Sequence, residues 1–258
     1  MARKLEITGL SKKFGELEAL RELSLAVDSG EFIAVVGPSG CGKTTFLRMV
    51  AGLEPATSGT ILLDGEPLRG PGGRRGFVFQ NDSLLPWRTV LSNALIGPEV
   101  AGRVGQSERK RTLDLLKLVG LGGFENYYPR QLSGGMRQRV NLARALAIDP
   151  EVLLMDEPFA ALDAQTREIM QTELLRIWEQ GRKTVVFVTH QIDEAVFLAD
   201  RVLVFARRPG RLQEAVTIDL PRPRGLDIKR KPEFVAYVDH IWKLIEDDVR
   251  ASVIEEGG

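Results

Sequence analysis

Several short apolar segments, each followed by a glycine or by polar residues, constrain the fold of this chain more than any other feature. The clearest are FIAVVG, VLLMDEP and KTVVFVTH, which begin at residues 32, 152 and 183. Such runs are typical of strands buried on both faces of a parallel sheet. Segments with helical spacing separate them, including KTTFLRMVAGL and DAQTREIMQTELLRIWEQ. This alternation predicts an α/β fold with a parallel sheet covered on both faces.

Other segments predict smaller structures around this core. KLEITGL and ELSLAVDSGE alternate apolar and polar residues, as half-buried strands do, and TILLDG and RGFVFQ predict further strands. Residues 91–146 contain SERKRTLDLLKLVGL and MRQRVNLARALA, whose spacing indicates a helical insertion. Near the end, PEFVAYVDHIWKLIEDDVR predicts an amphipathic helix.

The composition excludes several classes of protein. Among 258 residues, 35 Lys and Arg balance 35 Asp and Glu, so nothing suggests general attraction to nucleic acid or to an anionic membrane. The single cysteine, Cys41, excludes an internal disulfide and argues against a multi-cysteine zinc site. No apolar run approaches the roughly 20 residues of a spanning helix. We therefore expect a soluble cytosolic protein that would reach a membrane only through a partner.

A glycine-rich segment directly follows the first buried strand. Residues 37–44, GPSGCGKT, fit the pattern G-x-x-x-x-G-K-[ST] between a predicted strand and a predicted helix. Glycines let successive N–H groups point at an anion, Lys43 can reach the β- and γ-phosphates, and the Thr44 hydroxyl can hold Mg²⁺. The alternative is a glycine turn that only closes a strand–helix unit. The setting favours a nucleotide-binding loop, formed by Gly37, Pro38, Ser39, Gly40, Cys41, Gly42, Lys43, Thr44 and Thr45.

Two acids follow the strand VLLM. Asp156 and Glu157 come where a parallel sheet presents its ligand-binding edge. Asp156 fits the acid that helps to hold Mg²⁺ opposite the Lys43–Thr44 pair, and Glu157 fits a general base for an attacking water. The alternative is that one of the acids only caps the next helix.

Gln80 and His190 each follow a predicted strand as well. A neutral amide at position 80 suits water positioning or a metal contact, and an imidazole at position 190 can hydrogen-bond a γ-phosphate. Both residues can equally have structural roles, and their spacing alone leaves the choice open.

A second glycine-rich segment, QLSGGMRQRV from residue 131, runs into a predicted helix. Ser133, Gly134 and Gly135 there offer N–H groups at a helix start, which is a further arrangement suited to an anion. One chain would then have two phosphate-binding segments.

Taken together, GPSGCGKTT, VFQ, LSGGMRQR, LLMDEP, ALD and VTH resemble, in order and spacing, the ATP-binding subunits of ABC transporters over about residues 5–208. The resemblance implies a P-loop NTPase (RecA-like) core with a parallel sheet, an antiparallel β subdomain and an inserted helical subdomain. It places an ABC ATPase domain at 1–230, with its core at about 1–90 and 148–210 and the helical subdomain at 91–147. A short C-terminal extension with the terminal helix would occupy 207–258.

The same resemblance implies roles for individual residues. Lys43 and Thr44 match the Walker A motif, Asp156 the Walker B aspartate, Glu157 the catalytic glutamate, Gln80 the Q-loop glutamine and His190 the switch histidine. Asp163 matches the D-loop acid, and Phe14 resembles the aromatic that stacks on adenine, with a core aromatic as its alternative. The expected catalytic residues are Glu157, His190, Gln80 and Lys43, and the expected Mg²⁺ ligands are Thr44, Gln80 and Asp156.

Partners are also implied. Two copies would bind two ATP molecules head to tail, so that Ser133, Gly134 and Gly135 meet the γ-phosphate held by the other copy. The pore would be a separate permease at the inner (plasma) membrane, on whose cytoplasmic face the subunit is peripheral, and an extracytoplasmic solute-binding protein would act indirectly. Leu84, Leu85, Trp87 and Arg88 fall in the family's contact region for the permease, although part of this set can pack inside the helical subdomain. No nucleic acid is expected.

The segments LLPWRTVLSNAL and RRPGRLQEAVTIDLPRPRG resemble the corresponding sequences of ATP-binding subunits in importers of the nitrate/sulfonate/taurine group. Bicarbonate or a pyrimidine precursor remain alternative solutes. We interpret the five arginines of this tail, Arg207, Arg208, Arg211, Arg222 and Arg224, as solvated charge. A soluble ABC ATPase of DNA repair or translation and a non-enzymatic nucleotide-gated module are the rival functions.

Overall fold

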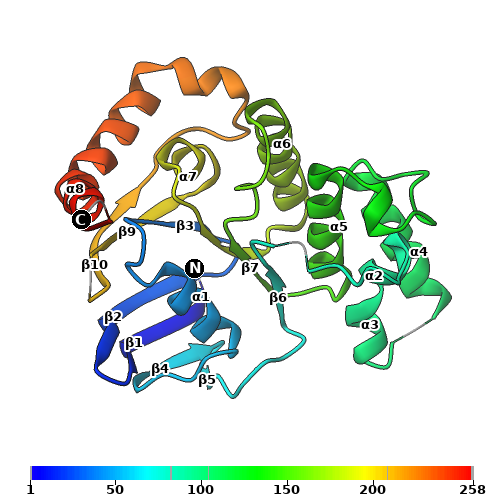
Figure 1. Ribbon diagram of the computed structural model, residues 1–258, viewed down its shortest axis with the longest axis horizontal. Helices are drawn as coiled ribbons and strands as arrows, with labels where there is room; N and C mark the ends of the chain where they lie inside the picture. The colour runs from blue at the N-terminus through cyan, green and yellow to red at the C-terminus, as the bar shows by residue number, and fades with distance from the viewer. Residues whose placement is uncertain (1, 82, 104, 208, 257–258) are drawn as a thin grey trace. The chain divides into compact units, whose positions relative to one another are not determined.

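The computed structural model describes residues 2–81, 83–103, 105–207 and 209–256. Contacts divide the chain into two compact units, Met1–Pro71 with Arg182–Gly258, and Gly72–Gly181. We call them the first and the second unit (Figure 1).

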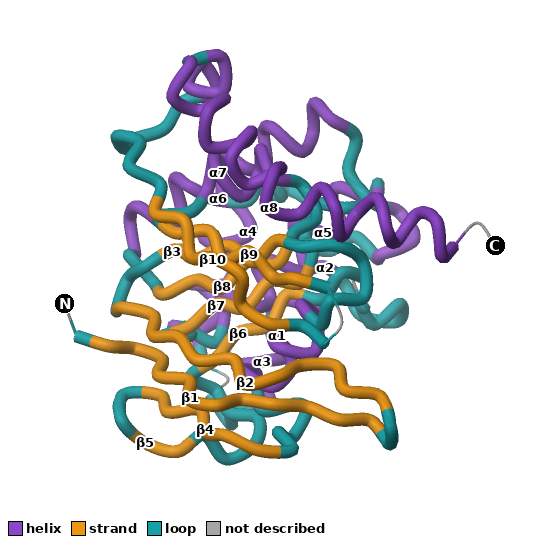
Figure 2. The backbone as a smooth tube through the Cα atoms, turned by 90° about the vertical axis from the view of Figure 1, so that its left-hand side faces the viewer, coloured by secondary structure: helices purple, strands orange, loops and turns teal. Residues whose placement is uncertain are grey.

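The first unit contains an antiparallel sheet of order β2-β1-β4-β5. Its strands are β1 (Arg3–Phe14), β2 (Leu17–Asp28), β4 (Ser58–Leu63) and β5 (Glu66–Pro67). In β1 and β2, buried residues such as Leu5, Ile7 and Val27 are interspersed with more exposed ones, as the alternating sequence predicts. Figure 2 shows β1, β2 and β4 side by side in orange. The predicted antiparallel β subdomain is therefore present.

The same unit contains the strands β10-β9-β3-β8, in that order. They are β3 (Phe32–Val36), β8 (Thr184–Val188), β9 (Arg201–Ala206) and β10 (Arg211–Thr217). β3 pairs in parallel with β8 and with β9, whereas β10 is antiparallel to β9. Every residue of β3 and β8 is buried, which explains why these segments are continuously apolar.

Four helices lie among the described residues of the first unit. They are α1 (Lys43–Ala51), α7 (Ile192–Leu198), the 3₁₀ helix η2 (Leu226–Arg230) and α8 (Pro232–Glu256). The terminal helix α8 contacts α7, β9 and η2, and Phe234, Ile241 and Ile245 are its buried residues among those whose side chains are described.

The second unit combines a strand pair with helices. β6 (Arg75–Val78) and β7 (Val152–Asp156) are parallel, with Val78 opposite Met155. The helices are α2 (Val90–Ala94), α3 (Ile96–Val100), α4 (Gln106–Leu118), the 3₁₀ helix η1 (Pro129–Gln131), α5 (Gly134–Ala147) and α6 (Ala164–Gly181). α5 contacts α2, α3 and α4. Among the residues described in both units, no helix is long and apolar enough to cross a membrane.

The C-terminal tail differs from the expectation of a solvated segment. Residues 211–217 form β10, Arg224 is buried, and only 13% of the Arg222 side chain is exposed. Arg207 is half-buried and Arg211 is exposed, as expected for surface charge, whereas Arg208 lies outside the described residues. The expectation was therefore wrong for Arg222 and Arg224, because their partners are main-chain carbonyls and an acid from distant positions.

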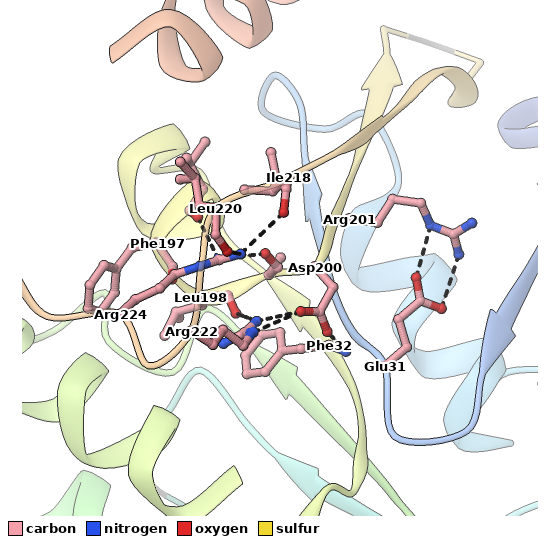
Figure 3. A network of polar contacts seen from close by, with 12 residues as sticks. Glu31, Phe32, Phe197, Leu198, Asp200, Arg201, Ile218, Leu220, Arg222 and Arg224 are labelled. Carbon is pink, nitrogen blue, oxygen red and sulfur yellow. Dashed lines mark hydrogen bonds and ion pairs between the residues drawn. The ribbon is translucent and has the colours of Figure 1, made fainter. Parts of the chain in front are cut away.

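Arg224 is the more deeply buried of the two, with 5% of its surface exposed. Its guanidinium donates hydrogen bonds to the carbonyls of Val196, Phe197 and Ala199 at the end of α7, and to those of Ile218 and Leu220 (Figure 3). Carbonyls at a helix C-terminus lack intrahelical donors and carry partial negative charge, so a cation suits this place. Burial and the neighbouring guanidinium of Arg222 lower the pKa of Arg224 to about 10, which leaves it charged at neutral pH.

Arg222 extends this network to the start of β3. Its guanidinium forms an ion pair with Asp200 at 2.7 Å and donates to the Leu198 carbonyl at 2.7 Å. Asp200 in turn accepts a hydrogen bond from the Phe32 backbone N–H at 2.9 Å. The tail thus fastens the end of α7 to the beginnings of β3 and β9.

We expect Arg224→Ala to lower the free energy of unfolding by about 2–4 kcal/mol, because several buried carbonyls lose their donor. Denaturant titration and the melting temperature measure this change. Arg211→Ala is the control, since Arg211 is exposed on β10, and should change stability by less than about 0.5 kcal/mol. Equal stability of the two variants would contradict a structural role for the Arg224 network.

Candidate active site

The segment from Gly37 to Gly42 forms a tight loop between β3 and α1. Gly37, Gly40 and Gly42 have φ values of 154°, 70° and 92°, which L side chains rarely adopt. A Cβ on Gly37 would lie 2.5 Å from the Phe205 carbonyl oxygen, and one on Gly42 would lie 2.8 Å from Leu20 Cδ2. The loop conformation therefore requires glycine at these positions, as a phosphate loop does.

Lys43 is the first residue of α1 and only 7% of its surface is exposed. Its ammonium donates to the carbonyls of Gly37 and Pro38 at 2.7 and 3.0 Å, so it lies folded over the loop. No side chain caps the N-terminus of α1 at Gly42, and helix N-termini of this kind attract anions. The lysine and the helix start together provide a positive site for phosphate.

Other residues of the loop differ in exposure. Ser39 and Gly40 are exposed, Thr44 and Thr45 are half-buried, and Pro38 and Cys41 are buried. Burial raises the pKa of the Cys41 thiol, which keeps it protonated and unreactive at neutral pH. Cys41 therefore packs as a small loop residue.

His190 and the phosphate loop lie at the same edge of the sheet. β3 pairs with β8 so that Val35 is opposite Val188, and Gly37 and His190 each follow two residues later. His190 itself is exposed. The Thr189 hydroxyl before it bonds the buried carboxylate of Glu194 and accepts from the Gln191 N–H at 3.0 Å, which fixes the turn between β8 and α7.

Phe14 lies at the end of β1 and 46% of its surface is exposed. The alternative of a core aromatic is therefore excluded. The ammonium of Lys12 lies over the ring, 4.7 Å from its centroid. The sequence did not predict that Lys12 is buried, because a lysine in a strand that alternates apolar and polar residues is expected to be exposed.

In the second unit, Gln80 and Glu157 are brought together. Both follow the carboxyl ends of the paired strands β6 and β7, and the Gln80 amide Nε2 donates to Glu157 Oε2 at 3.3 Å. Asp156 is the last residue of β7 and is 5% exposed, whereas Glu157 is half-buried with a φ of 46°. Carboxylate and amide oxygens of this kind are ligands that Mg²⁺ prefers, so Gln80 and Asp156 of this unit suit the predicted cation.

Asp163, rather than Glu157, caps the following helix. Its carboxylate accepts from the Thr166 N–H at 3.0 Å at the start of α6, and this hydrogen bond lowers the pKa of Asp163. The alternative of a capping role for Glu157 is therefore excluded. Asp163 itself is exposed.

The second glycine-rich segment also begins a helix. The Ser133 hydroxyl caps α5 by accepting from the Met136 N–H at 3.2 Å, and Gly134 and Gly135 are the first helical residues. Farther along α5, Asn141 donates to the Phe79 carbonyl at 3.0 Å, directly before Gln80. The helix start and the segment that carries Gln80 are therefore linked through α5.

The predicted permease-contact residues separate into two groups. Leu84 is buried and Arg88 forms an ion pair with Glu99 at 2.5 Å, whereas Trp87 is 71% exposed. Leu85 is half-buried. Two tyrosines that sequence reasoning missed, Tyr127 and Tyr128, are exposed at 42% and 40%, and the Tyr127 carbonyl accepts from Val90 N–H at 2.8 Å. Three exposed aromatic side chains therefore lie on the helical part of this unit.

Comparison with known proteins agrees with these features. The ABC transporter family model matches residues 20–160. An uncharacterized ABC transporter ATP-binding protein of Methanocaldococcus jannaschii is 52% identical and covers 98% of this chain and 95% of its own length. The nitrate import ATP-binding protein NrtD of Synechocystis is 48% identical, covering 93% of this chain and 94% of that protein. The taurine import ATP-binding protein TauB of Yersinia pseudotuberculosis is 46% identical, with 92% and 95% covered.

A solved structure of an ATP-binding cassette has a similar fold. An ATP-binding cassette determined as a dimer in a post-hydrolysis state, bound to ADP and Pi, has a TM-score of 0.74 and 34% identity. The match covers 86% of this chain and 100% of that one. These similarities confirm the predicted fold class and the resemblance to the nitrate/sulfonate/taurine group. The chain belongs to the ABC transporter family, as an ATP-binding subunit with the family's ATPase activity.

Proposed function

We propose that this ATPase subunit powers uptake of a small anionic solute, such as nitrate, an aliphatic sulfonate or taurine, through a separate permease at the cytoplasmic face of the membrane. The observation that carries the nucleotide part is the glycine loop with Lys43 folded over it. The similarity to NrtD and TauB supports the class of solute. Bicarbonate and a pyrimidine precursor remain the alternatives within the same role.

The proposed roles follow from the chemistry of each residue. Lys43 and the N-terminus of α1 bind the β- and γ-phosphates, while Thr44, Gln80 and Asp156 hold Mg²⁺, which neutralises phosphate charge. Glu157 accepts a proton from the attacking water, and His190 hydrogen-bonds the γ-phosphate. Phe14 stacks on adenine with its exposed face.

A second copy completes the proposed cycle. Ser133, Gly134 and Gly135 of one copy contact the γ-phosphate bound by the other, and Asp163 lies in the same contact. ATP favours the closed dimer because these contacts exist only there, and hydrolysis removes them. The exposed Trp87, Tyr127 and Tyr128 are suited to meet the permease, since aromatic anchors are frequent at interfaces. The solute-binding protein acts from the other side of the membrane.

The direct test of transport is reconstitution. The chain is co-purified with its permease and solute-binding protein, and ATP turnover is measured with nitrate, taurine and bicarbonate in turn. Stimulation by one anion identifies the solute. ATP turnover that no solute changes, in an assembled complex, would contradict the import function.

Replacing Gly42 with Ala should abolish tight ATP binding, because the new Cβ would meet Leu20 and the Ala19 carbonyl in a left-handed conformation. Isothermal calorimetry with MgATP measures the loss. Gly65→Ala is the matched control: its φ is 78° and nothing lies within 4 Å of the added Cβ. The control should lose roughly 1–2 kcal/mol of stability and no ATP affinity.

We expect Glu157→Gln to retain ATP binding and to lower turnover by at least about 100-fold, because an amide cannot accept the proton. Phosphate release measures turnover, and size-exclusion chromatography with ATP should show a stabilised dimer. Turnover at the wild-type rate would refute the role of general base.

We expect Ser133→Arg to bind ATP as a monomer and to lose hydrolysis and dimer closure, because a large side chain would block contact with the other copy's nucleotide. Ser133→Ala separates this effect from capping. It removes the hydrogen bond to Met136 N–H and should cost about 1 kcal/mol of stability. Full activity of Ser133→Arg would show that the segment does not meet a nucleotide.

A further inference from the structure

The Lys12 side chain is held in an unusually fixed position for a lysine near the protein surface. Only 7% of the residue is exposed. Its ammonium donates to the Pro55 carbonyl at 2.8 Å and forms an ion pair with Glu54 at 2.5 Å. The same nitrogen lies 4.7 Å from the centroid of the Phe14 ring. A cation within about 6 Å of a ring centroid is attracted to the ring.

The partners of Lys12 show from which side it approaches the ring. Glu54 and Pro55 follow the C-terminal end of α1, which spans Lys43–Ala51, whereas the phosphate loop precedes its N-terminal end. The two ends of a nine-residue helix are about 13 Å apart. The ammonium therefore comes from the end of α1 that is remote from the phosphate loop.

The hairpin that carries Phe14 also lies beside the phosphate loop. Lys12 pairs with Leu20 across the β1–β2 ladder, and Leu20 lies against Gly42 of the loop. A nucleotide whose phosphates occupy the loop would thus have its base within reach of the hairpin that carries Phe14. Since 46% of Phe14 is exposed, the ring retains surface for such a contact.

We propose that Lys12 positions Phe14 for recognition of the base, with the ring between the ammonium on one face and the purine on the other. The inference rests on the proposed binding of ATP with Phe14 against adenine. The ammonium attracts π-electron density, fixes the tilt of the ring and makes its open face less electron-rich, which favours stacking with an electron-rich purine. Lys12 acts through Phe14 and is a positioning residue.

A purely structural role would have a different signature. If Lys12 only tied β1 to the segment after α1, its removal would weaken all ligands of the phosphate loop equally, through lost stability. A role in base recognition predicts an effect on ATP and none on inorganic triphosphate, which has the phosphates without the base.

The test compares dissociation constants of Mg²⁺ complexes of ATP and inorganic triphosphate for four single variants and one double variant of the full-length chain. Lys12→Met keeps the apolar stem without the charge and should weaken ATP binding about two- to fivefold, with unchanged triphosphate binding. Lys12→Arg keeps a cation and should restore most of the ATP affinity. Lys13→Met is the matched control, since it removes an adjacent, exposed charge. Phe14→Ala removes the ring, and adding Lys12→Met to it should weaken ATP binding no further.

The outcomes separate this inference from the proposed function. Equal weakening of both ligands, tighter ATP binding by Lys12→Met, or full additivity with Phe14→Ala would overturn the role of Lys12. If Phe14→Ala weakens ATP binding and Lys12→Met does not, the stacking assignment stands and only the inference fails. If Phe14→Ala leaves ATP affinity unchanged, the stacking assignment fails and the inference fails with it.

Discussion

Close packing around the phosphate loop is the constraint on which the first unit depends. Gly37 lies against β9, Gly42 lies against β2, and a Cβ on Gly210 would lie 2.0 Å from the Cys41 carbonyl oxygen. Gly210 also exchanges backbone hydrogen bonds with Ala19 and Arg21 of β2 at 3.0 and 2.9 Å. The loop, the β1–β2 hairpin and the turn before β10 therefore meet at a junction with no room for side chains. Any change that separates them alters the loop and the hairpin that carries Phe14 together.

Much of this arrangement could be predicted because it is encoded locally. FIAVVG and KTVVFVTH are continuously apolar because β3 and β8 are buried along their whole length. The polar residues that follow such strands, His190 in one unit and Glu157 in the other, must lie at the carboxyl edge wherever the strands are parallel. The α/β class with its parallel sheet followed from these patterns, whereas the P-loop NTPase core was implied by the resemblance to ABC transporter subunits. The division into subdomains at residues 91–147 stays a prediction.

The features that could not be predicted depend on distant partners. Arg222 and Arg224 lie in a segment rich in proline and arginine, which by composition is typical of a solvated loop. Their burial depends on carbonyls at the end of α7 and on Asp200, which are 22 to 28 residues away along the chain. Lys12 is similar, since its carbonyl acceptor, Pro55, is 43 residues away. A charged side chain can be buried only where the fold provides hydrogen-bond acceptors or an opposite charge. The local sequence does not show which distant groups will provide them.

The contact between Gln80 and Glu157 shows why an amide suits this place in the second unit. Glu157 has a left-handed φ of 46°, which costs a non-glycine residue roughly 1–2 kcal/mol. Glycine at position 157 would adopt this φ without strain. The presence of a glutamate there therefore indicates that its side chain has a role. The Gln80 amide steadies the carboxylate through its nitrogen at 3.3 Å, and its carbonyl oxygen, the atom that a cation would bind, is not used in this bond. An acid at position 80 would repel Glu157 and a lysine would neutralise it, so an amide can hold the Glu157 carboxylate and still offer an oxygen to the proposed Mg²⁺.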